Sequence, residues 1–238
     1  MAIYLRDLDL VFLHVPKTAG SFLRRFFIDN FRTQSVADFH AIPLYLPKEF
    51  QEKKKFCFVR NPVDWYKSYW ACLMTNIEKQ ANGEEGLEWL LPIPETGWAM
   101  SEPGIPWHPN RIIDVHCGRR NFNQFVKACI QHFPGYVSYQ YKLYADHCDF
   151  VGKQETLVDD MVKLLCPHGV DEADLRKKLA QTPRVNEADQ KWKDQAVIDP
   201  KLHNTLKRLE TFEMYSNPIS EDEEILYNQD FLAGGKQY

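Results

Sequence analysis

The chain has 238 residues, 44% of them hydrophobic and 26% charged, which is enough to bury a sizeable core in one α/β domain. A formal charge of −4 gives no general basis for binding nucleic acid or an acidic membrane surface, so any anion site has to be local. The six cysteines lack CxxC pairs and zinc-ligand spacing, and no stretch approaches the roughly 18 apolar residues of a membrane span, so we expect a reduced, metal-free, cytoplasmic protein.

The first recognisable unit is LVFLHVPKTAGSFLRRFF, at residues 10–27. Residues 10–15 form a continuous apolar run with β-branched and aromatic members, which is typical of a strand buried on both faces. Pro16 ends the strand, Gly20 gives the conformational freedom of a tight loop, and Ser21 is suited to cap the following helix. Apolar side chains then recur at helical spacing, at Phe22, Leu23, Phe26, Phe27 and Phe31.

The loop between this strand and helix has the chemistry of an anion site. A helix that begins at a loop directs backbone N–H groups and the positive end of its dipole toward whatever binds there. Lys17 adds a full positive charge, and Thr18 and Ser21 add hydroxyl donors. The alternative is an ordinary strand–turn–helix unit with a lysine on its surface.

A second strand–helix junction follows further along the chain. Residues 56–59 predict a strand, Asn61 is a favourable N-cap, and Pro62 suits the first position of a helix. Arg60 therefore lies at the carboxyl end of a strand, and Ser68 lies about two turns into the helix. Loops at the carboxyl ends of parallel strands line the ligand crevice of an open sheet, so we expect both junctions to meet there.

Periodicity is lost over residues 77–118, which are rich in Pro and Gly and contain three tryptophans. Long irregular segments in compact domains are often functional, so this one is a candidate lid or acceptor-binding insertion. It carries seven acidic residues against two basic ones. That balance favours a neutral acceptor over a polyanionic one.

The rest of the chain alternates helical patterns with one short strand. We predict a helix over 122–133, a tyrosine-rich connection, a strand over 148–151, and helices over 155–166, 171–180 and from Pro200 onward. Neither an internal repeat nor a domain boundary is visible. The sequence is therefore interpreted as a single domain, residues 1–238.

Together the two junctions resemble a known family. PKTAGS at 16–21, followed by Arg60-Asn61-Pro62 and Ser68, is similar to the two nucleotide signatures of sulfotransferases that use 3′-phosphoadenosine-5′-phosphosulfate (PAPS). A weaker similarity lies in FVGKQE at 150–155, which resembles a stretch of many carbohydrate-type members. The resemblance implies a three-layer fold related to P-loop proteins, with a mainly parallel central sheet and helices on both faces.

The resemblance also implies roles for individual residues. The 5′-phosphosulfate would be held by the first signature, at Lys17, Thr18, Ala19, Gly20, Ser21 and Phe22. Arg60 and Ser68 would hold the 3′-phosphate, since a planar multi-donor side chain and a hydroxyl suit that group. Lys17 would stabilise the charge that grows on the leaving nucleotide, 3′-phosphoadenosine-5′-phosphate (PAP), and Ser21 could share that role. No metal is required.

Transfer to an acceptor hydroxyl needs a general base, and histidine is the commonest base near neutral pH. His40 is the candidate, because it lies between the two signatures, where the family often places a His or Glu base. The alternatives are His116, His108 or a carboxylate. His14, directly before the loop, is expected to pack within the scaffold.

Arg184, within PRVN at 183–186, is a candidate for a late loop that closes on the nucleotide, as in many sulfotransferases. The alternative is a solvated loop without a binding role. The Arg-Lys-Gly triplet of cytosolic small-molecule members is missing, which places the resemblance closer to the carbohydrate-type members.

Two other functions stay open on the sequence. One is a P-loop nucleotide kinase, although Pro16 stands directly before Lys17 and the preceding strand contains no glycine. The other is a non-catalytic nucleotide-binding module, which would keep the anion loops but lack a base.

Overall fold

The computed structural model describes residues 2–37, 40–84, 113, 117, 121–185 and 187–215. Within them a five-stranded sheet has the order β3-β1-β2-β4-β5. The strands are β1 (Ala2–Leu5), β2 (Leu10–Leu13), β3 (Thr33–Ala37), β4 (Lys54–Val59) and β5 (Phe150–Lys153). β2, β4 and β5 pair in parallel, whereas β1 is antiparallel to both of its neighbours.

The sheet is therefore mixed, and the expectation of a mainly parallel sheet holds only for β2, β4 and β5. The difference comes from β1, which a tight connection joins to β2 as an antiparallel pair. In this connection Asp9 adopts a left-handed backbone conformation (φ 55°) and accepts a hydrogen bond from the Tyr4 hydroxyl at 2.7 Å. Four apolar residues of β1 gave too short a pattern to reveal this pairing.

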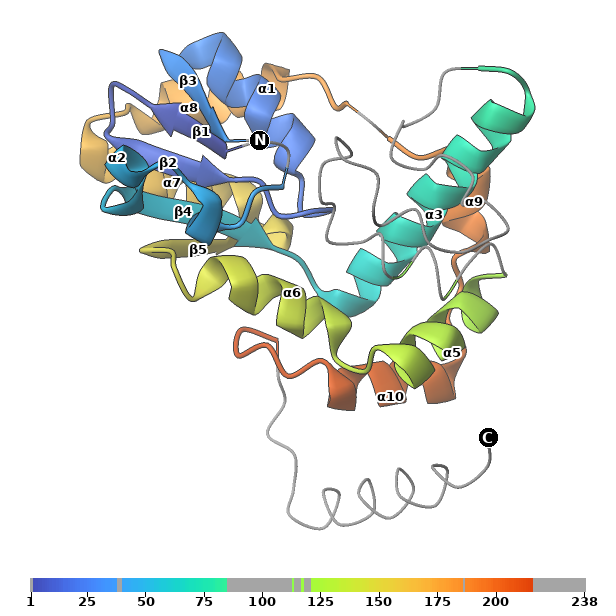
Figure 1. The fold of residues 1–238 in the computed structure, drawn as a ribbon. Helices are drawn as coiled ribbons and strands as arrows, with labels where there is room; N and C mark the ends of the chain where they lie inside the picture. Colours follow the sequence, from blue (N-terminus) through green and yellow to red (C-terminus); the bar gives the residue numbers. More distant parts are fainter. Residues whose placement is uncertain are drawn as a thin grey trace.

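Helices cover both faces of the sheet, as Figure 1 shows. Their bounds are α1 (Gly20–Asn30), α2 (Lys48–Gln51), α3 (Pro62–Ala81), α5 (Phe122–His132), α6 (Tyr136–Ala145), α7 (Leu157–Leu165), α8 (Glu172–Gln181), α9 (Gln190–Gln195) and α10 (Pro200–Leu209). Short 3₁₀ turns lie at Pro43–Tyr45, Gln154–Thr156 and Cys166–His168.

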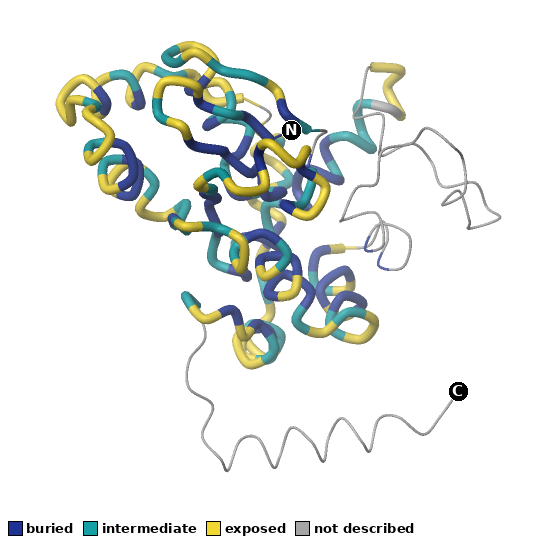
Figure 2. Tube along the Cα trace, turned by 60° about the vertical axis from the view of Figure 1, so that its left-hand side comes forward, coloured by how far each residue is buried: buried dark blue, intermediate teal, exposed yellow. Residues whose placement is uncertain are grey.

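Alternating side chains of the strands divide the core between the two faces. Val11 and Val59 pack with apolar side chains of α3, α5 and α6. Phe12 and Phe56 belong to the opposite cluster, which includes apolar side chains of α1, α7 and α8. Because successive strand side chains point to opposite faces, these strands supply both clusters. Figure 2 colours the buried stretches of the chain dark blue.

Several helices depart from the sequence-based expectations. The tyrosine-rich connection after α5 is itself helical, as α6, so that prediction is wrong. α3 continues through Ala81, so residues 77–81 are helical rather than irregular. Most of the expected irregular segment lies outside the described residues, but Ile113 and Cys117 are described, and both are buried.

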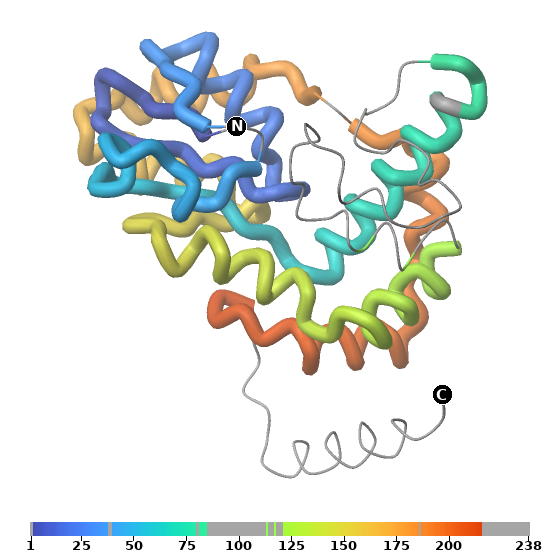
Figure 3. Tube along the Cα trace, in the orientation of Figure 1, coloured from blue at the N-terminus to red at the C-terminus, as the bar shows by residue number. Residues whose placement is uncertain are grey.

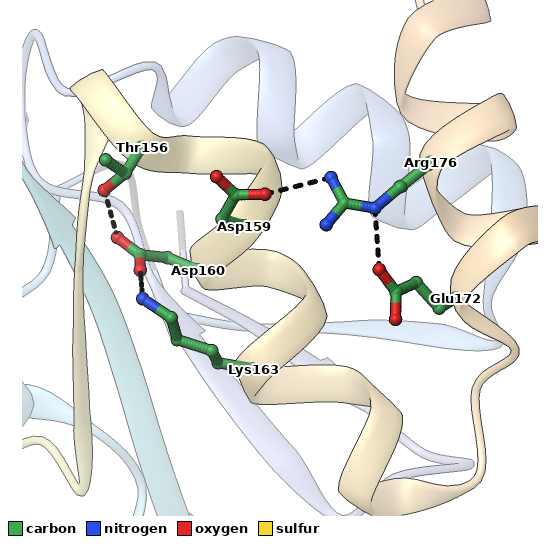
Figure 4. A network of polar contacts seen from close by, with 6 residues as sticks. All are labelled: Thr156, Asp159, Asp160, Lys163, Glu172 and Arg176. Carbon is green, nitrogen blue, oxygen red and sulfur yellow. Dashed lines mark hydrogen bonds and ion pairs between the residues drawn. The ribbon is translucent and has the colours of Figure 1, made fainter.

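Asp160 fixes the connection between β5 and α7, as the close view in Figure 4 shows. Its carboxylate accepts hydrogen bonds from the Thr156 hydroxyl at 2.7 Å, the Lys163 ammonium at 2.7 Å and the Lys153 backbone N–H at 2.9 Å. Burial alone would raise the pKa of Asp160, but these donors outweigh it and hold the pKa below its usual value. The network thereby positions the start of α7.

A second salt-bridge network joins α7 to α8. The Arg176 guanidinium contacts Asp159 at 2.9 Å and Glu172 at 2.8 Å (Figure 4). These exposed pairs add little stability individually. The position of α8 beside α7 depends more on Leu175 and Leu179, which are buried in the same core cluster as apolar side chains of α7.

A buried carboxylate, Glu210, ties the chain after α10 to α3 and α6. It accepts hydrogen bonds from the Tyr66 hydroxyl at 2.8 Å and from the backbone N–H and hydroxyl of Ser138, both at 2.7 Å. Burial raises the pKa of Glu210, and the hydrogen bonds offset only part of that effect.

Glu210→Ala should lower the free energy of unfolding by about 3 kcal/mol or more, since each buried donor left without an acceptor costs about 1–3 kcal/mol. Urea unfolding measures the change.

The effect of this substitution should depend on pH. Because the pKa of Glu210 is raised in the folded state, the folded protein holds this proton more tightly than the unfolded chain does. The stability that Glu210 contributes is therefore full below the usual pKa of 4.5 and declines as the pH rises through the raised value. The cost of the substitution should therefore be smaller at pH 8 than at pH 5. An exposed control, Glu49→Ala, should change stability by no more than about 0.5 kcal/mol, and an equally small effect of Glu210→Ala would refute the role.

Candidate functional site

A cavity of about 800 Å³ lies where the ends of β2 and β4 meet α1 and α3. It brings together nine of the ten residues that the sequence singled out for the site: Lys17, Ala19, Gly20, Ser21, Phe22, His40, Arg60, Ser68 and Arg184. The two signatures are far apart in the sequence and face one space. The prediction that both strand–helix junctions meet at the carboxyl ends of parallel strands is thus confirmed.

The loop before α1 has a backbone shape suited to anions. Lys17 and Ala19 both adopt left-handed conformations, with φ of 63° and 68°, whereas Thr18 between them does not. Such alternation turns successive N–H groups inward and forms an anion-binding concavity. For non-glycine residues this conformation costs about 1–3 kcal/mol each, which is typical of functional sites.

Two expectations for this loop are corrected. Thr18 is buried, and its hydroxyl donates to the Val15 carbonyl at 3.0 Å, so it stabilises the loop and does not line the cavity. Ser21 is not the N-cap of α1, which begins at Gly20 with Ala19 in the capping position. The capping residue therefore has no side chain that could occupy the first N–H groups of the helix. Trp65 further fixes the loop by donating its indole N–H to the Pro16 carbonyl at 2.8 Å.

Gly20 is required by a close approach to His14. A Cβ at position 20 would lie 1.8 Å from Cδ2 and 2.1 Å from Nε2 of the His14 ring. The loop can turn into α1 only because this residue has no side chain.

Gly20→Ala should therefore displace the loop or the ring, lowering the free energy of unfolding by about 1–3 kcal/mol through overpacking. Urea unfolding checks the change. Removing the His14 ring removes the clash. Gly20→Ala should therefore cost less stability when it is added to His14→Ala than when it is added to the wild-type protein. Strict additivity of the two substitutions would show that the two positions do not interact.

Arg60 stands at the end of β4 on a rigid support. Its backbone N–H donates to the Tyr141 hydroxyl oxygen at 3.1 Å, and that hydroxyl donates to the Arg60 carbonyl at 2.7 Å. The next residue, Asn61, donates its N–H to Glu155 at 2.6 Å and accepts from the Val63 N–H at 3.0 Å, as expected for the N-cap of α3. Glu155, the last residue of the FVGKQE stretch, thus contributes to the junction.

The Arg60 side chain is prepared for an anion. Its Nε atom is buried and has no hydrogen-bond partner among the described residues. Burial lowers the pKa of the guanidinium, and the nearby Asp64 carboxylate offsets part of that effect. A partly desolvated cation gains more from an anionic ligand than an exposed one does. Ser68, on α3, lines the same cavity.

Charges in the described cavity wall are mostly positive. Five cationic side chains line it against one carboxylate, Glu187; the cations are Lys17, Arg60, Lys67, Arg184 and Lys193. The described wall is thus a local concentration of positive charge in a chain whose net charge is −4. Sequence reasoning missed Lys67, although it precedes Ser68 on the same helix, and Lys193, which lies on the unpredicted α9.

His40 lies in the same wall and is 7% exposed. Its Nδ1 is 2.9 Å from the His14 carbonyl oxygen, and its own carbonyl accepts from the Tyr144 hydroxyl at 2.7 Å. A carbonyl oxygen only accepts, so Nδ1 carries the proton, and Nε2 is the basic nitrogen of the neutral ring. The alternative bases His108 and His116 lie outside the described residues.

Arg184 is exposed and belongs to a segment that joins α8 to α9 along the cavity, the orange stretch in Figure 3. α9 is held on α3: the Asp189 N–H donates to the Thr75 hydroxyl at 2.9 Å, and the Trp192 indole N–H donates to Glu78 at 3.0 Å. The segment therefore has a fixed attachment on the α3 side.

Across the residues that the structure describes, no three His, Cys, Asp or Glu side chains are grouped so that they could hold a metal ion. In the same residues no helix has the length and apolar character needed to cross a membrane. Comparisons with protein-family models, curated proteins and solved structures gave no match. The functional conclusion therefore rests on the site itself.

Proposed function

We propose that the protein is a sulfotransferase that moves a sulfuryl group from PAPS to an acceptor hydroxyl. The observation that carries this proposal is the meeting of two anion sites in one cationic cavity. The Lys17 loop suits a phosphosulfate, and Arg60 with Ser68 suits a separate phosphate. PAPS has these two anionic groups, whereas ADP and ATP carry a single polyphosphate.

In the proposed reaction the acceptor oxygen forms a bond to sulfur while the bond from sulfur to the bridging phosphate oxygen breaks. Nε2 of His40 takes the proton of the acceptor hydroxyl. Lys17 stabilises the negative charge that develops on the bridging oxygen, with Ser21 as a second donor. A transferred sulfuryl group carries less charge than a terminal phosphoryl group, so these side chains suffice without a divalent metal.

The acceptor that we propose is neutral, such as a carbohydrate or a small hydroxylated metabolite. The cavity cations match the charge of the donor, and residues 77–118 carry seven acidic side chains against two basic ones. A polyanionic acceptor would gain nothing from cavity cations that are already neutralised by the donor, and the acidic side chains of residues 77–118 would repel it.

The experiment is a thermal-shift titration with PAP, ADP and Mg-ATP in parallel. PAP at about 100 times its dissociation constant should add about 2.7 kcal/mol to the free energy of unfolding. For a chain of this size that corresponds to a rise of several degrees, at roughly 2–4 °C per kcal/mol. ADP, which lacks the 3′-phosphate, should give a much smaller shift.

The titration also separates the competing functions. A shift with Mg-ATP alone would replace the proposal with a nucleotide kinase. A shift with PAP, together with no consumption of PAPS on any hydroxylated compound, would favour the non-catalytic binding module. No shift with any of the three nucleotides would reject the proposed donor.

A further inference from the structure

Two buried histidines stand side by side at the phosphosulfate end of the cavity. His14 is 4% exposed, His40 is 7% exposed, and both line the cavity. Their ring centroids are 4.5 Å apart, with 60° between the ring planes. The roles proposed so far use only the ring of His40.

The two rings face different partners. The Cδ2–Nε2 edge of His14 packs against Gly20, the first residue of α1, on the side of the Lys17 loop. The Nδ1–H of His40 is instead held by the His14 carbonyl. His14 is therefore the ring of the pair that packs against the first residue of α1, beside the Lys17 loop.

We propose that His14 and His40 form a pair with divided roles, in which His14 takes up a proton when an anionic nucleotide occupies the Lys17 loop, while His40 stays neutral as the base. This inference rests on the proposed function and adds a second histidine to the site.

The charges around the pair explain why the proton arrives with the ligand. In the free protein, Lys17 and the positive end of α1 disfavour a further cation beside Gly20. From the other described elements, Arg60 of β4 and Lys67 of α3 line the same cavity, and Tyr144 of α6 meets His40 with a neutral hydroxyl. The one described carboxylate of the cavity wall, Glu187, is already paired with Lys193 at 3.0 Å. A phosphosulfate or phosphate bound at the loop adds negative charge beside His14, and a proton on this ring then becomes favourable.

Proximity then keeps His40 neutral. Two imidazolium rings at this distance repel each other strongly, so before the transfer the pair holds one added proton and not two. A proton on His14 therefore opposes protonation of His40 by solvent, and Nε2 of His40 is unprotonated when the acceptor arrives. His40 takes the acceptor proton during the transfer and releases it to solvent as the product leaves. Before the transfer, the two neighbouring rings are thus held in opposite protonation states.

The test measures protons taken up when PAP binds. Isothermal titration calorimetry near pH 7, in buffers of different ionisation enthalpy, gives this number directly. The 3′-phosphate of PAP titrates near pH 6 itself, so the quantity compared is the difference between wild type and His14→Gln, in which the contribution of the ligand cancels. We expect wild type to take up more protons than His14→Gln, by up to about one per bound PAP.

Two variants and one spectrum make the result decisive. His40→Gln should keep the excess uptake, and so should His168→Gln, a control at an exposed histidine outside the cavity. In NMR titrations of the wild-type protein, the His14 ring signals should shift to a higher apparent pKa on adding PAP, which needs no variant to fold.

Proton uptake at the wild-type level in His14→Gln, together with lower uptake in His40→Gln, would place the proton on His40 and overturn the inference. Equal uptake in all variants, with unchanged His14 signals, would also overturn it. Failure of the wild-type protein to bind PAP would instead reject the proposed function, and the role of the pair with it.

Discussion

Lys17→Ala should lower the rate of sulfuryl transfer by at least about 10²–10³, the cost of removing one charge-stabilising donor from a transition state. Lys17 lines the cavity at the loop where the leaving oxygen is expected. Alanine adopts the left-handed conformation of this position about as poorly as lysine does, so the substitution adds little backbone strain. The fold should therefore persist while turnover is lost. Release of PAP from PAPS, with a screened neutral alcohol as acceptor, measures the effect.

The matched control is Lys48→Ala, at an exposed lysine of α2 outside the cavity. It should leave both turnover and the unfolding midpoint at the wild-type value. Lys17→Arg keeps the charge but changes its shape, and it should fall between wild type and Lys17→Ala. Turnover near the wild-type value in Lys17→Ala would remove Lys17 from the chemistry.

The parts of the fold that sequence reasoning located correctly are those with strong local signals. The apolar runs of β2 and β4 and the Asn61-Pro62 start of α3 depend on neighbouring residues alone, and each is confirmed. The same is true of α8, whose Asp171 cap accepts from the Asp174 N–H at 2.8 Å.

The elements that were missed depend on partners distant in sequence. β1 and β3 are short, and their pairing with each other is a long-range contact. The sequence predicts only a tyrosine-rich connection where α6 lies. In the structure Tyr141 and Tyr144 are fully buried, and their hydroxyls reach the carbonyls of Arg60 and His40. A tyrosine whose hydroxyl has a hydrogen-bond partner can be buried like any other core residue. The sequence does not show which tyrosines find such a partner.

The candidate site divides in the same way. Lys17, Arg60 and Ser68 could be placed from their positions at strand ends and on a helix. The inward turn of Thr18 and the approach of His14 to Gly20 depend on side-chain contacts across the loop. Lys193 enters the cavity wall only because α9 packs on α3, which no local pattern indicates.

Arg60→Ala should weaken PAP binding by about 1.5–3 kcal/mol, the typical value of hydrogen bonds to a charged group. At 1.4 kcal/mol per tenfold change this is roughly a 10- to 150-fold rise in the dissociation constant. Isothermal titration calorimetry measures it. The substitution should not lower the stability of the free protein, because it removes a partly desolvated cation whose Nε has no hydrogen-bond partner among the described residues. Arg25→Ala, at an exposed ion pair of α1, is the control that should leave PAP binding unchanged.

The choice of ligand decides which anion Arg60 serves. Adenosine-5′-phosphosulfate carries the phosphosulfate but no 3′-phosphate, so its affinity should be nearly the same in wild type and Arg60→Ala. The loss should appear only with PAP or PAPS. An equal loss with both ligands would mean that Arg60 binds the phosphosulfate. Arg60 and Lys17 would then serve the same anion, and the evidence for a second anion site would be lost. Loss confined to the 3′-phosphorylated ligands would assign Arg60 to the 3′-phosphate, apart from the phosphosulfate that Lys17 is proposed to hold, which is the arrangement that a PAPS-dependent enzyme requires.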